Sequence, residues 1–426
     1  MSSRSRTGSA RSRKHTVLAL PPVSVFPFST NKNYRMDFEF WWLLGIPVFF
    51  ALGWIAARVD INQLVSESRS LPRNYFKGLN FLLTEQHDKA IDAFIEIVKL
   101  DPESADMHFA LGNLFRRRGE TERAIRVHQN LLARPDLPQE QQVHAAYELG
   151  MDYLKAGLLD RAEETFNGLV ETQYAVQARR ALLEIFQREK EWPRAIEAAL
   201  GLQESGAGAR QKEIAQFYCE LAHDALVHLK PDDAMPLLEK ALQTDRKSVR
   251  ATILTGDVLL ARGDVEEAIM TWRRVEQQSV PHVALVAQRL MDGYSKLGRP
   301  QEGINLLRSY LEEATSIDLI EVVFKAVLDL DGVDAAKQLV SAELRRTPTL
   351  LGLDKLLEAR MMDAPAAIWS ELSMVKNLVH GYTQKLARYQ CSHCGFKARQ
   401  FYWHCPGCNK WETYPPRRTE ELNVMN

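Results

Sequence analysis

From about residue 72 to residue 388, apolar side chains recur every three or four positions, which places them on one face of an α-helix. The amphipathic segments come in pairs, and the pairs repeat at about 34 residues, so that Ala124 follows Ala90 by one period. The most regular pair, residues 106–138, carries small or apolar residues at fixed offsets, namely Leu111, Gly112, Phe115, Gly119 and Ala124. We therefore expect a series of helix–turn–helix units that is not interrupted by strands.

Three further segments keep the same offsets. The first has Gly78, Phe81, Ala90, Phe94 and a terminating Asp101-Pro102; the second has Leu149, Gly150, Tyr153, Gly157, Ala162 and Phe166; the third has Gly256, Leu259, Gly263, Ala268 and Trp272. This spacing is typical of the tetratricopeptide repeat. Weaker units surround Ala195, Ala234, Gly303 and Ala335. The sequence predicts an all-α superhelical solenoid of seven to eight units over residues 72–388, and the agreement at several positions in four units disfavours a generic helical bundle.

The repeated residue types have mechanical roles. Small residues such as Gly112 and Ala124 let paired helices approach closely, and large ones such as Trp272 fill the space between units. A solenoid of this kind leaves a concave face on which proteins or peptides dock. Candidates for that partner-binding groove are Asn113 and Arg116–Arg118, although a charged run on a helix is more often a solvated face, and the groove residues are not identified by the sequence.

An uncharged stretch precedes the repeats. Eighteen residues from Phe40 to Ala57 carry no charge, and as a helix they would be about 27 Å long, close to the ~30 Å of a bilayer core. Trp41 and Trp54 lie near its two ends, where aromatic rings prefer the headgroup layer. A cleaved signal peptide or a buried core helix is the alternative, but the stretch is long for a signal and lacks an A-x-A site. The sequence predicts one transmembrane helix over residues 38–58.

Orientation depends on where translation starts. Residues 1–35 contain seven Lys or Arg and no Asp or Glu, which would hold the N-terminus in the cytoplasm. A start at Met36 would instead leave a short acidic N-terminus that crosses easily and a basic flank after the helix, at Arg58, Arg69, Arg73 and Lys77. We expect the second case, with the bulk of the chain cytoplasmic and residues 1–35 a mis-assigned or disordered leader; a transit peptide is a weaker alternative.

Composition narrows the protein class. The 426 residues include 46% apolar and 26% charged residues, typical of a folded protein, and only 22 Gly and 18 Pro, few for the turns of an all-β fold. Beyond residue 35 the chain has 47 basic against 55 acidic residues, a net charge of −8. Nucleic acid is therefore not an expected partner, because phosphate binding needs clustered positive charge.

Four of the five cysteines are grouped near the C-terminus, in Cys391-Ser-His-Cys394 and Cys405-Pro-Gly-Cys408. Two C-x-x-C pairs ten residues apart form two knuckles that can offer a tetrahedral shell of four sulfurs to one Zn²⁺ or Fe ion. Two disulfides are the alternative, but they need an oxidising compartment. We expect His393 and His404 to lie beside the site rather than in it, and the fifth cysteine, Cys219, to be part of the core.

The cysteine segment, residues 389–418, is too short to fold by apolar burial alone. Its stability should depend on the metal, on the adjacent solenoid and on five aromatic residues, Tyr389, Phe396, Phe401, Trp403 and Trp411. Between residues 388 and 418, six Lys or Arg stand against the single Glu412, so a nucleic-acid-binding ribbon is an alternative. A structural metal module is the expectation.

An anchor, a tetratricopeptide solenoid and a CSHCGF…HCPGC module in this order resemble the lipopolysaccharide assembly protein B family of Gram-negative inner membranes. The likeness covers residues 36 to about 418; the 35-residue leader and Asn409, where the second knuckle often has Gly, depart from the family pattern. The resemblance implies a rubredoxin-like module that packs on the repeats, with ligands Cys391, Cys394, Cys405 and Cys408, and slightly favours iron. It also implies an adaptor that promotes degradation of the LpxC deacetylase by the FtsH protease.

The sequence contains no Walker A loop, no G-x-G-x-x-G after a strand, no H-E-x-x-H and no G-x-S-x-G. A non-enzyme that binds proteins of the inner membrane and cytoplasm is therefore expected. Two alternatives belong to other classes: a membrane-tethered redox protein with an Fe(Cys)4 centre, and a periplasmic scaffold. The sequence leaves open the choice between iron and zinc and the oligomeric state, a homo-oligomer included.

Overall fold

A computed structural model describes residues 47–54, 73–100, 102–313, 316–386 and 388–424. The chain divides into two compact units, residues 1–73 and 74–426. In the first unit, residues 47–54 are helical. No helix among the described residues combines the length and the apolar character needed to cross a bilayer. The predicted leader (1–35) lies outside the described residues, as does the predicted transmembrane helix (38–58) apart from residues 47–54.

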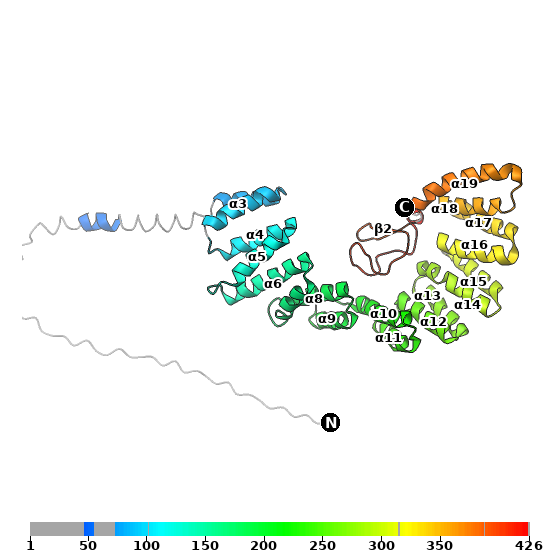
Figure 1. Ribbon diagram of the computed structural model, residues 1–426, viewed down its shortest axis with the longest axis horizontal. Coiled ribbons are helices and arrows are strands. Elements are labelled where there is room, and N and C mark those ends of the chain that lie inside the picture. The colour runs from blue at the N-terminus through cyan, green and yellow to red at the C-terminus, as the bar shows by residue number, and fades with distance from the viewer. Residues whose placement is uncertain (1–46, 55–72, 101, 314–315, 387, 425–426) are drawn as a thin grey trace, which may run out of the picture. The chain divides into compact units, whose positions relative to one another are not determined.

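Helices α2 to α19 follow one another in consecutive pairs, α2 with α3 and so on to α18 with α19 (Figure 1). Nine such pairs can be traced among the described residues, where the sequence predicted seven to eight units. The first five pairs are α2 (Arg73–Leu83), α3 (His87–Leu100), α4 (Ala105–Arg118), α5 (Thr121–Leu132), α6 (Gln139–Ala156), α7 (Leu159–Asn167), α8 (Ala175–Glu189), α9 (Trp192–Glu204), α10 (Gln211–Val227) and α11 (Pro231–Thr244). The last four pairs are α12 (Val249–Arg262), α13 (Val265–Gln278), α14 (Ala287–Lys296), α15 (Pro300–Glu313), α16 (Ile317–Asp331), α17 (Val333–Arg346), α18 (Leu350–Met361) and α19 (Ala366–Leu386), with the 3-10 helix η1 (Val280–Leu285) before α14.

Within a pair, a glycine of the first helix lies against a large ring of the second. The two positions are sixteen residues apart in four units: Gly78 and Phe94, Gly112 and His128, Gly150 and Phe166, Gly256 and Trp272. Trp272 is fully buried, contacts its own unit's glycine and also reaches Gly293 of the next unit. The structure confirms the predicted close approach of paired helices at the small residues and the contact of Trp272 with the next unit. The rings also fill space within their own unit.

The turns between paired helices are short because the first helix ends at a glycine in the left-handed region. Gly119 (φ 87°) ends α4, and its N–H donates to the carbonyls of Phe115 and Arg116. Gly263 (φ 94°) ends α12 in the same way, at the same place in a later unit. An L side chain in this conformation is strained, which explains why the repeat carries glycine here.

The two largest clusters of buried apolar residues each span several neighbouring repeats. One cluster of buried apolar residues extends from Val249 to Ala359, and a second extends from Leu149 to Phe217. Cys219 is fully buried in a third cluster, as predicted, and burial raises its thiol pKa to about 12. The all-α repeat architecture predicted from the sequence is therefore confirmed for the described array.

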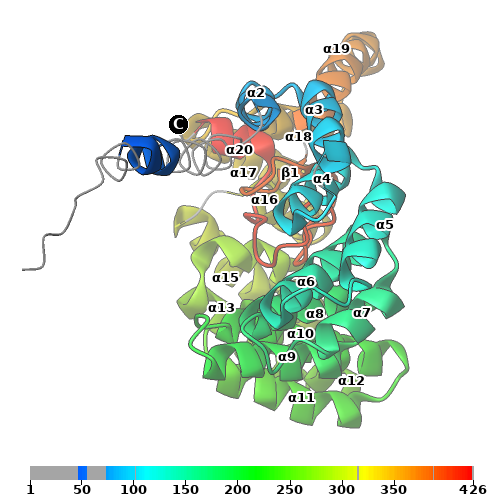
Figure 2. The ribbon, with the colours of Figure 1, turned by 90° about the vertical axis from the view of Figure 1, so that its left-hand side faces the viewer.

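After α19 the chain forms two short strands and loops instead of paired helices. Strands β1 (Tyr389–Gln390) and β2 (Lys397–Ala398) form a two-stranded antiparallel sheet with Tyr389 opposite Ala398, and an isolated bridge joins His404 to Trp411. The short helix α20 (Thr419–Val424) follows. This segment lies on the inner side of the curve of helices (Figures 1 and 2). Its position brings it against several repeats at once.

Candidate metal centre

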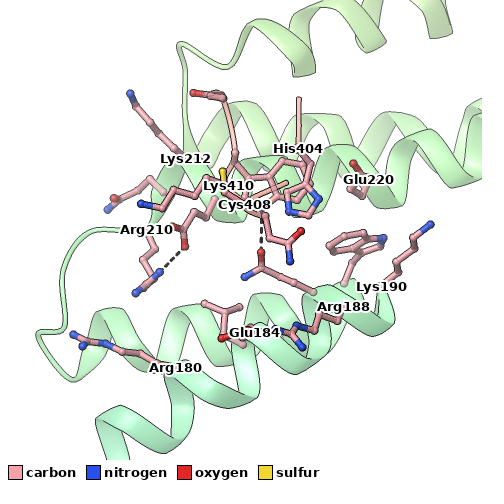
Figure 3. Close-up of a pocket in the computed structure, with 18 of the residues that line it drawn as sticks. Arg180, Glu184, Arg188, Lys190, Arg210, Lys212, Glu220, His404, Cys408 and Lys410 are labelled. Atoms are coloured by element: carbon pink, nitrogen blue, oxygen red, sulfur yellow. Dashed lines mark hydrogen bonds and ion pairs between the residues drawn. The ribbon is translucent and has the colours of Figure 1, made fainter. Parts of the chain in front are cut away.

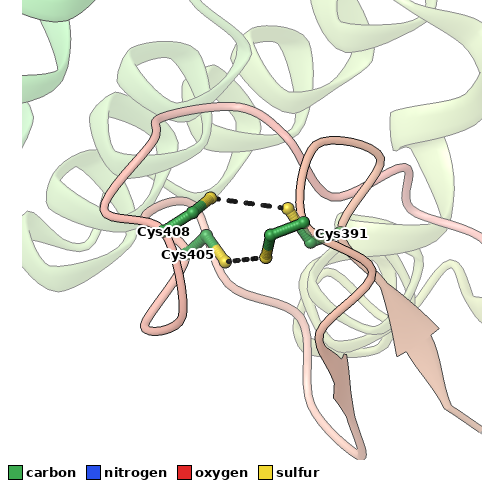
Figure 4. A group of neighbouring side chains, drawn as sticks. Cys391, Cys405 and Cys408 are labelled. Atoms are coloured by element: carbon green, nitrogen blue, oxygen red, sulfur yellow. Dashed lines mark hydrogen bonds between the residues drawn. The ribbon is translucent and has the colours of Figure 1, made fainter. Parts of the chain in front are cut away.

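Two tight turns bring the four clustered cysteines together (Figure 4). Their sulfur atoms all lie within 4.8 Å of one another. The sulfur of Cys391 is 3.8 Å from that of Cys408, and the sulfur of Cys394 is 3.7 Å from that of Cys405. Each short distance joins one knuckle to the other, so the four atoms form one compact group rather than two separate pairs.

The spacing of the sulfurs fits a tetrahedral metal shell. For a metal–sulfur distance of about 2.3 Å, the sulfurs of such a shell are roughly 3.8 Å apart. The two cross-knuckle distances of 3.7 and 3.8 Å match this value, whereas a disulfide would need sulfurs roughly 2.05 Å apart. The cysteines are not disulfide-bonded. The group therefore suits a single ion of the zinc or iron class.

The thiols have very different acidities. Burial opposes ionisation of Cys391, but the Thr413 hydroxyl, 3.2 Å from its sulfur, and the backbone N–H groups of Cys394 and His393 lower its pKa to about 6. Burial raises the pKa of Cys408 to about 12, and the neighbouring sulfurs add to the rise. Four thiolates at these distances would repel one another, so their joint ionisation requires a cation between them.

The two knuckles have the same backbone turn. The N–H of Gly395 donates to the carbonyl of Cys391 at 3.0 Å, and the N–H of Asn409 donates to the carbonyl of Cys405 at 2.8 Å. Gly395 has φ 76° and Asn409 has φ 53°, both in the left-handed region. Asparagine is among the few residues other than glycine that visit this region readily, so the departure at Asn409 preserves the turn.

The two nearby histidines lie outside the sulfur group. His393 is exposed, and the ring of His404 stacks on the indole of Trp411 with 4.3 Å between centroids. Burial lowers the pKa of His404. Among the described residues, the candidate metal-binding group contains the four cysteines and neither histidine.

Two tryptophans connect the module to different parts of the array. Trp411 packs edge-on against Trp192 of α9 and Phe217 of α10, at 6.0 and 5.8 Å between centroids, and its indole N–H donates to Gln187 of α8 at 3.2 Å. Trp403 stacks on His282 of η1 at 5.7 Å. The module is therefore held at two places along the array, about two repeats apart. Phe396, predicted to help stabilise the module, is 44% exposed.

Ionic contacts add a third attachment that sequence reasoning missed. Asp318 at the start of α16 accepts a hydrogen bond from the Tyr389 hydroxyl at 2.6 Å and pairs with Arg418 at 2.7 Å.

Glu420 accepts hydrogen bonds from the backbone N–H groups of Leu350 and Leu351 at 2.5 and 3.0 Å, and Glu421 accepts one from the backbone N–H of Ile317. Two carboxylates of the C-terminal segment thus cap the N-termini of α18 and α16, where the helix dipole favours negative charge. No local signal in the sequence marks these pairs.

The arginines of the second unit that were predicted to line the partner-binding groove differ in their exposure and in their ion pairs. Arg116 pairs with Glu148 at 2.5 Å and with the fully buried Asp152 at 2.9 Å, and Asp152 also contacts His128 at 2.5 Å. This network joins α4 to α5 and α6, so Arg116 stabilises the array and is not available to a partner. Arg117 and Arg118 are exposed, and Arg118 pairs with Asp88 and Glu120.

Two family models match the repeats and the cysteine segment. Residues 389–416 match the family model described as a rubredoxin metal binding domain. Residues 77–136, 147–210 and 219–282 match the tetratricopeptide repeat model. Among solved structures, a chain of the Naa15/Naa10 complex bound to HypK-THB covers 74% of this chain at 16% identity, with a TM-score of 0.36.

Two curated relatives align over nearly their whole length. Lipopolysaccharide assembly protein B of Escherichia coli K12 is 39% identical over 381 residues, which is 88% of this chain and 97% of the relative. The protein of the same name from Haemophilus influenzae is 29% identical over 395 residues, which is 89% of this chain and 98% of the relative. The 39% identity to the first relative and the coverage of both chains lead to one conclusion: the chain belongs to the lipopolysaccharide assembly protein B family.

Proposed function

We propose that this protein is an adaptor of lipopolysaccharide assembly, anchored in the inner membrane with its bulk in the cytoplasm, that promotes FtsH-dependent proteolysis of the LpxC deacetylase. The observation that carries the proposal is the 39% identity to lipopolysaccharide assembly protein B over 97% of that protein's length. A role in lipopolysaccharide assembly follows from the names of the relatives. The proteolytic mechanism, with FtsH and LpxC as partners, is the finer part of the proposal.

Binding rather than catalysis is the activity that the fold supports. A tetratricopeptide array presents a long surface made of successive helices, which suits a partner protein or an extended peptide. The adaptor increases the rate of proteolysis by holding substrate and protease on one membrane, because confinement raises their effective concentration.

We propose that Cys391, Cys394, Cys405 and Cys408 hold one Fe or Zn ion whose role is structural. The ion, when bound, neutralises the thiolates and closes the two knuckles into one unit. The spacing of the sulfurs supports this assignment. The packing of Trp403 and Trp411 on the array supports a structural role, because both rings extend from the segment that the metal would fix.

The membrane anchor and its orientation belong to the proposal. Within the proposed anchor, residues 47–54 are helical and expose Phe49, Phe50 and Leu52, as expected of side chains that face lipid. A four-thiolate site suits the reducing cytoplasm. Alkaline phosphatase fused to the C-terminus should be inactive in cells, while a cytoplasmic reporter at the same position should be active. High phosphatase activity would contradict the cytoplasmic orientation.

The decisive experiment is a pulse-chase measurement of LpxC in cells with and without this protein. Its deletion should lengthen the half-life of LpxC and raise the amount of lipopolysaccharide. A chain that lacks residues 36–58 should be folded and soluble but restore LpxC turnover poorly, because it is no longer confined to the membrane. An LpxC half-life that does not respond to the protein would reject the proposed mechanism.

A further inference from the structure

A large groove lies between the metal module and the middle of the array. Its volume is 1310 Å³, and it opens between α8, the start of α10 and the second cysteine knuckle (Figure 3). One wall is the knuckle segment 407–410, so the groove exists only where the module is docked on the repeats. Six basic and four acidic residues line it.

Each of the four acidic residues is already paired within the chain. Glu184 pairs with Arg188, Glu213 with Arg210 at 2.6 Å, and Glu220 with Arg250 at 2.8 Å. Glu412 accepts a hydrogen bond from Gln216 at 2.7 Å. Three of the carboxylates are therefore compensated by arginines, whereas the amide of Gln216 satisfies an oxygen of Glu412 but leaves its negative charge.

The four remaining basic residues are not compensated. Arg180, Lys190, Lys212 and Lys410 are exposed, and in the part of the chain that the structure describes their side chains make no hydrogen bond or ion pair. Arg180 lies in α8 and Lys190 directly follows that helix. Lys212 lies in the first turn of α10, and Lys410 lies in the segment of the second knuckle. The N-terminus of α10 adds positive partial charge at the same place. The groove is thus a locally positive surface on a chain whose residues 36–426 carry a net charge of −8.

The arrangement of these cations indicates the kind of ligand. They surround the groove from three elements (Figure 3), so one small anion cannot contact all of them, whereas a chain with several carboxylates can. The side-chain amides of Gln211 and Asn409 are exposed beside them, and within the described residues they have no hydrogen-bond partner. Amides of this kind pair well with a peptide backbone.

Nucleic acid fits the groove less well than a peptide. Trp411 has little free surface for stacking a base, because Trp192, Phe217 and His404 occupy its surroundings. Binding of single-stranded nucleic acid relies on such free aromatic faces.

We propose that the groove between the second cysteine knuckle and α8–α10 binds an extended acidic segment of a partner protein. The choice of a protein as ligand rests on the adaptor function proposed above. The site itself is argued from the charges of this chain and does not depend on which protein supplies the segment. Long-range attraction should speed association, and contact with the four cations should select acidic sequences.

The test uses the full-length protein in detergent and a fluorescein-labelled 15-residue peptide of Asp, Glu, Ser and Gly, followed by fluorescence anisotropy. A matched peptide with Asn and Gln in place of the acids should bind at least tenfold more weakly. The double reversal Lys212→Glu with Lys410→Glu should weaken binding of the acidic peptide on the order of tenfold at low salt, since exposed charges are screened as salt rises.

The matched control reverses two exposed lysines away from the groove, Lys240→Glu and Lys296→Glu, and should leave the affinity unchanged. Melting temperature and metal content are measured for every variant, so that a folding defect is not mistaken for lost binding. If the affinities are intact in K212E/K410E, or equal for acidic and neutral peptides, the inference is wrong.

A 15-nucleotide single strand serves as the competing ligand. Tighter binding of the oligonucleotide than of the acidic peptide, sensitive to the same reversal, would overturn the assignment to a protein segment. The LpxC half-life separates this inference from the proposed function. If the half-life depends on the protein but the acidic peptide does not bind, only the inference fails. If the peptide binds but the half-life does not change, only the proposed mechanism fails.

Discussion

Gly256 on α12 lies directly against the indole of Trp272 on α13. A methyl group added at position 256 would come within 2.2 Å of the indole Nε1 atom, whose hydrogen is donated to the carbonyl of Ile253 at 3.1 Å. The indole is fully buried and so cannot move aside. The close approach of the two helices in this unit therefore depends on the absence of a side chain at one position.

Gly256→Ala should destabilise the array by about 1–3 kcal/mol, because a methyl group forced into a packed core displaces its neighbours. The melting temperature of the fragment 59–426 should fall by several degrees. Gly381→Ala is the matched control: position 381 is a helical glycine of α19 with no atom near its added methyl, and alanine there should be neutral or stabilising. Equal melting temperatures for the two variants would contradict the packing argument.

Cys405→Ser should release the metal and lower the melting temperature, because the loss of one thiolate opens a four-sulfur shell. Elemental analysis and an absorption spectrum of the wild type distinguish iron from zinc. Cys219→Ala, at the buried cysteine outside the group, should keep the full metal content even if it costs some stability. Retention of metal by C405S would mean that the four-cysteine assignment is wrong.

Trp411→Ala should detach the second knuckle from α8–α10 while the metal is retained, because the indole packs on the array and supplies no metal ligand. Removing a half-buried tryptophan should cost about 3 kcal/mol of docking free energy. Hydrogen exchange should rise in residues 389–416 and at the start of α10. Trp369→Ala, a half-exposed tryptophan of α19, should change neither region. Unchanged exchange in W411A would show that the other contacts suffice for docking.

Docking of the module should weaken in mild acid because of His282. Burial lowers the pKa of this histidine to about 4, from about 6.5 when it is exposed. Between these values the unfolded or undocked state binds more protons than the native state, so the stabilisation is complete above pH 6.5 and is lost progressively as the pH falls toward 4.

His282→Phe keeps a ring to stack on Trp403 but cannot take up a proton. The melting temperature of this variant should therefore fall less steeply between pH 6.5 and 5 than that of the wild type, with metal content monitored at each pH. The exposed His228→Phe is the control and should keep the wild-type slope. The same slope in all three proteins would remove His282 as the source of the pH dependence.

The sequence by itself determined the repeat array and the cysteine group, because both are encoded locally. The partners Gly150 and Phe166 are sixteen residues apart, within one 34-residue period, so their contact follows from helix geometry and a short turn. The two knuckles are likewise complete within 18 residues, from Cys391 to Cys408, and Asn409 keeps a turn that glycine would otherwise make.

Only the tertiary structure decided where the module sits and which charges are free. Trp411 and Gln187 are 224 positions apart, and Arg418 and Asp318 are 100 apart, so no periodic pattern links them. Arg116, a groove candidate from its place in a basic run, is held by Glu148 and Asp152 of the next unit. Beside the proposed acidic-segment groove, the side chains of Lys212 and Lys410 have no ion-pair partner among the residues that the structure describes. Long-range packing of the folded chain determines which charges are paired, and a sequence pattern records only what neighbouring residues share.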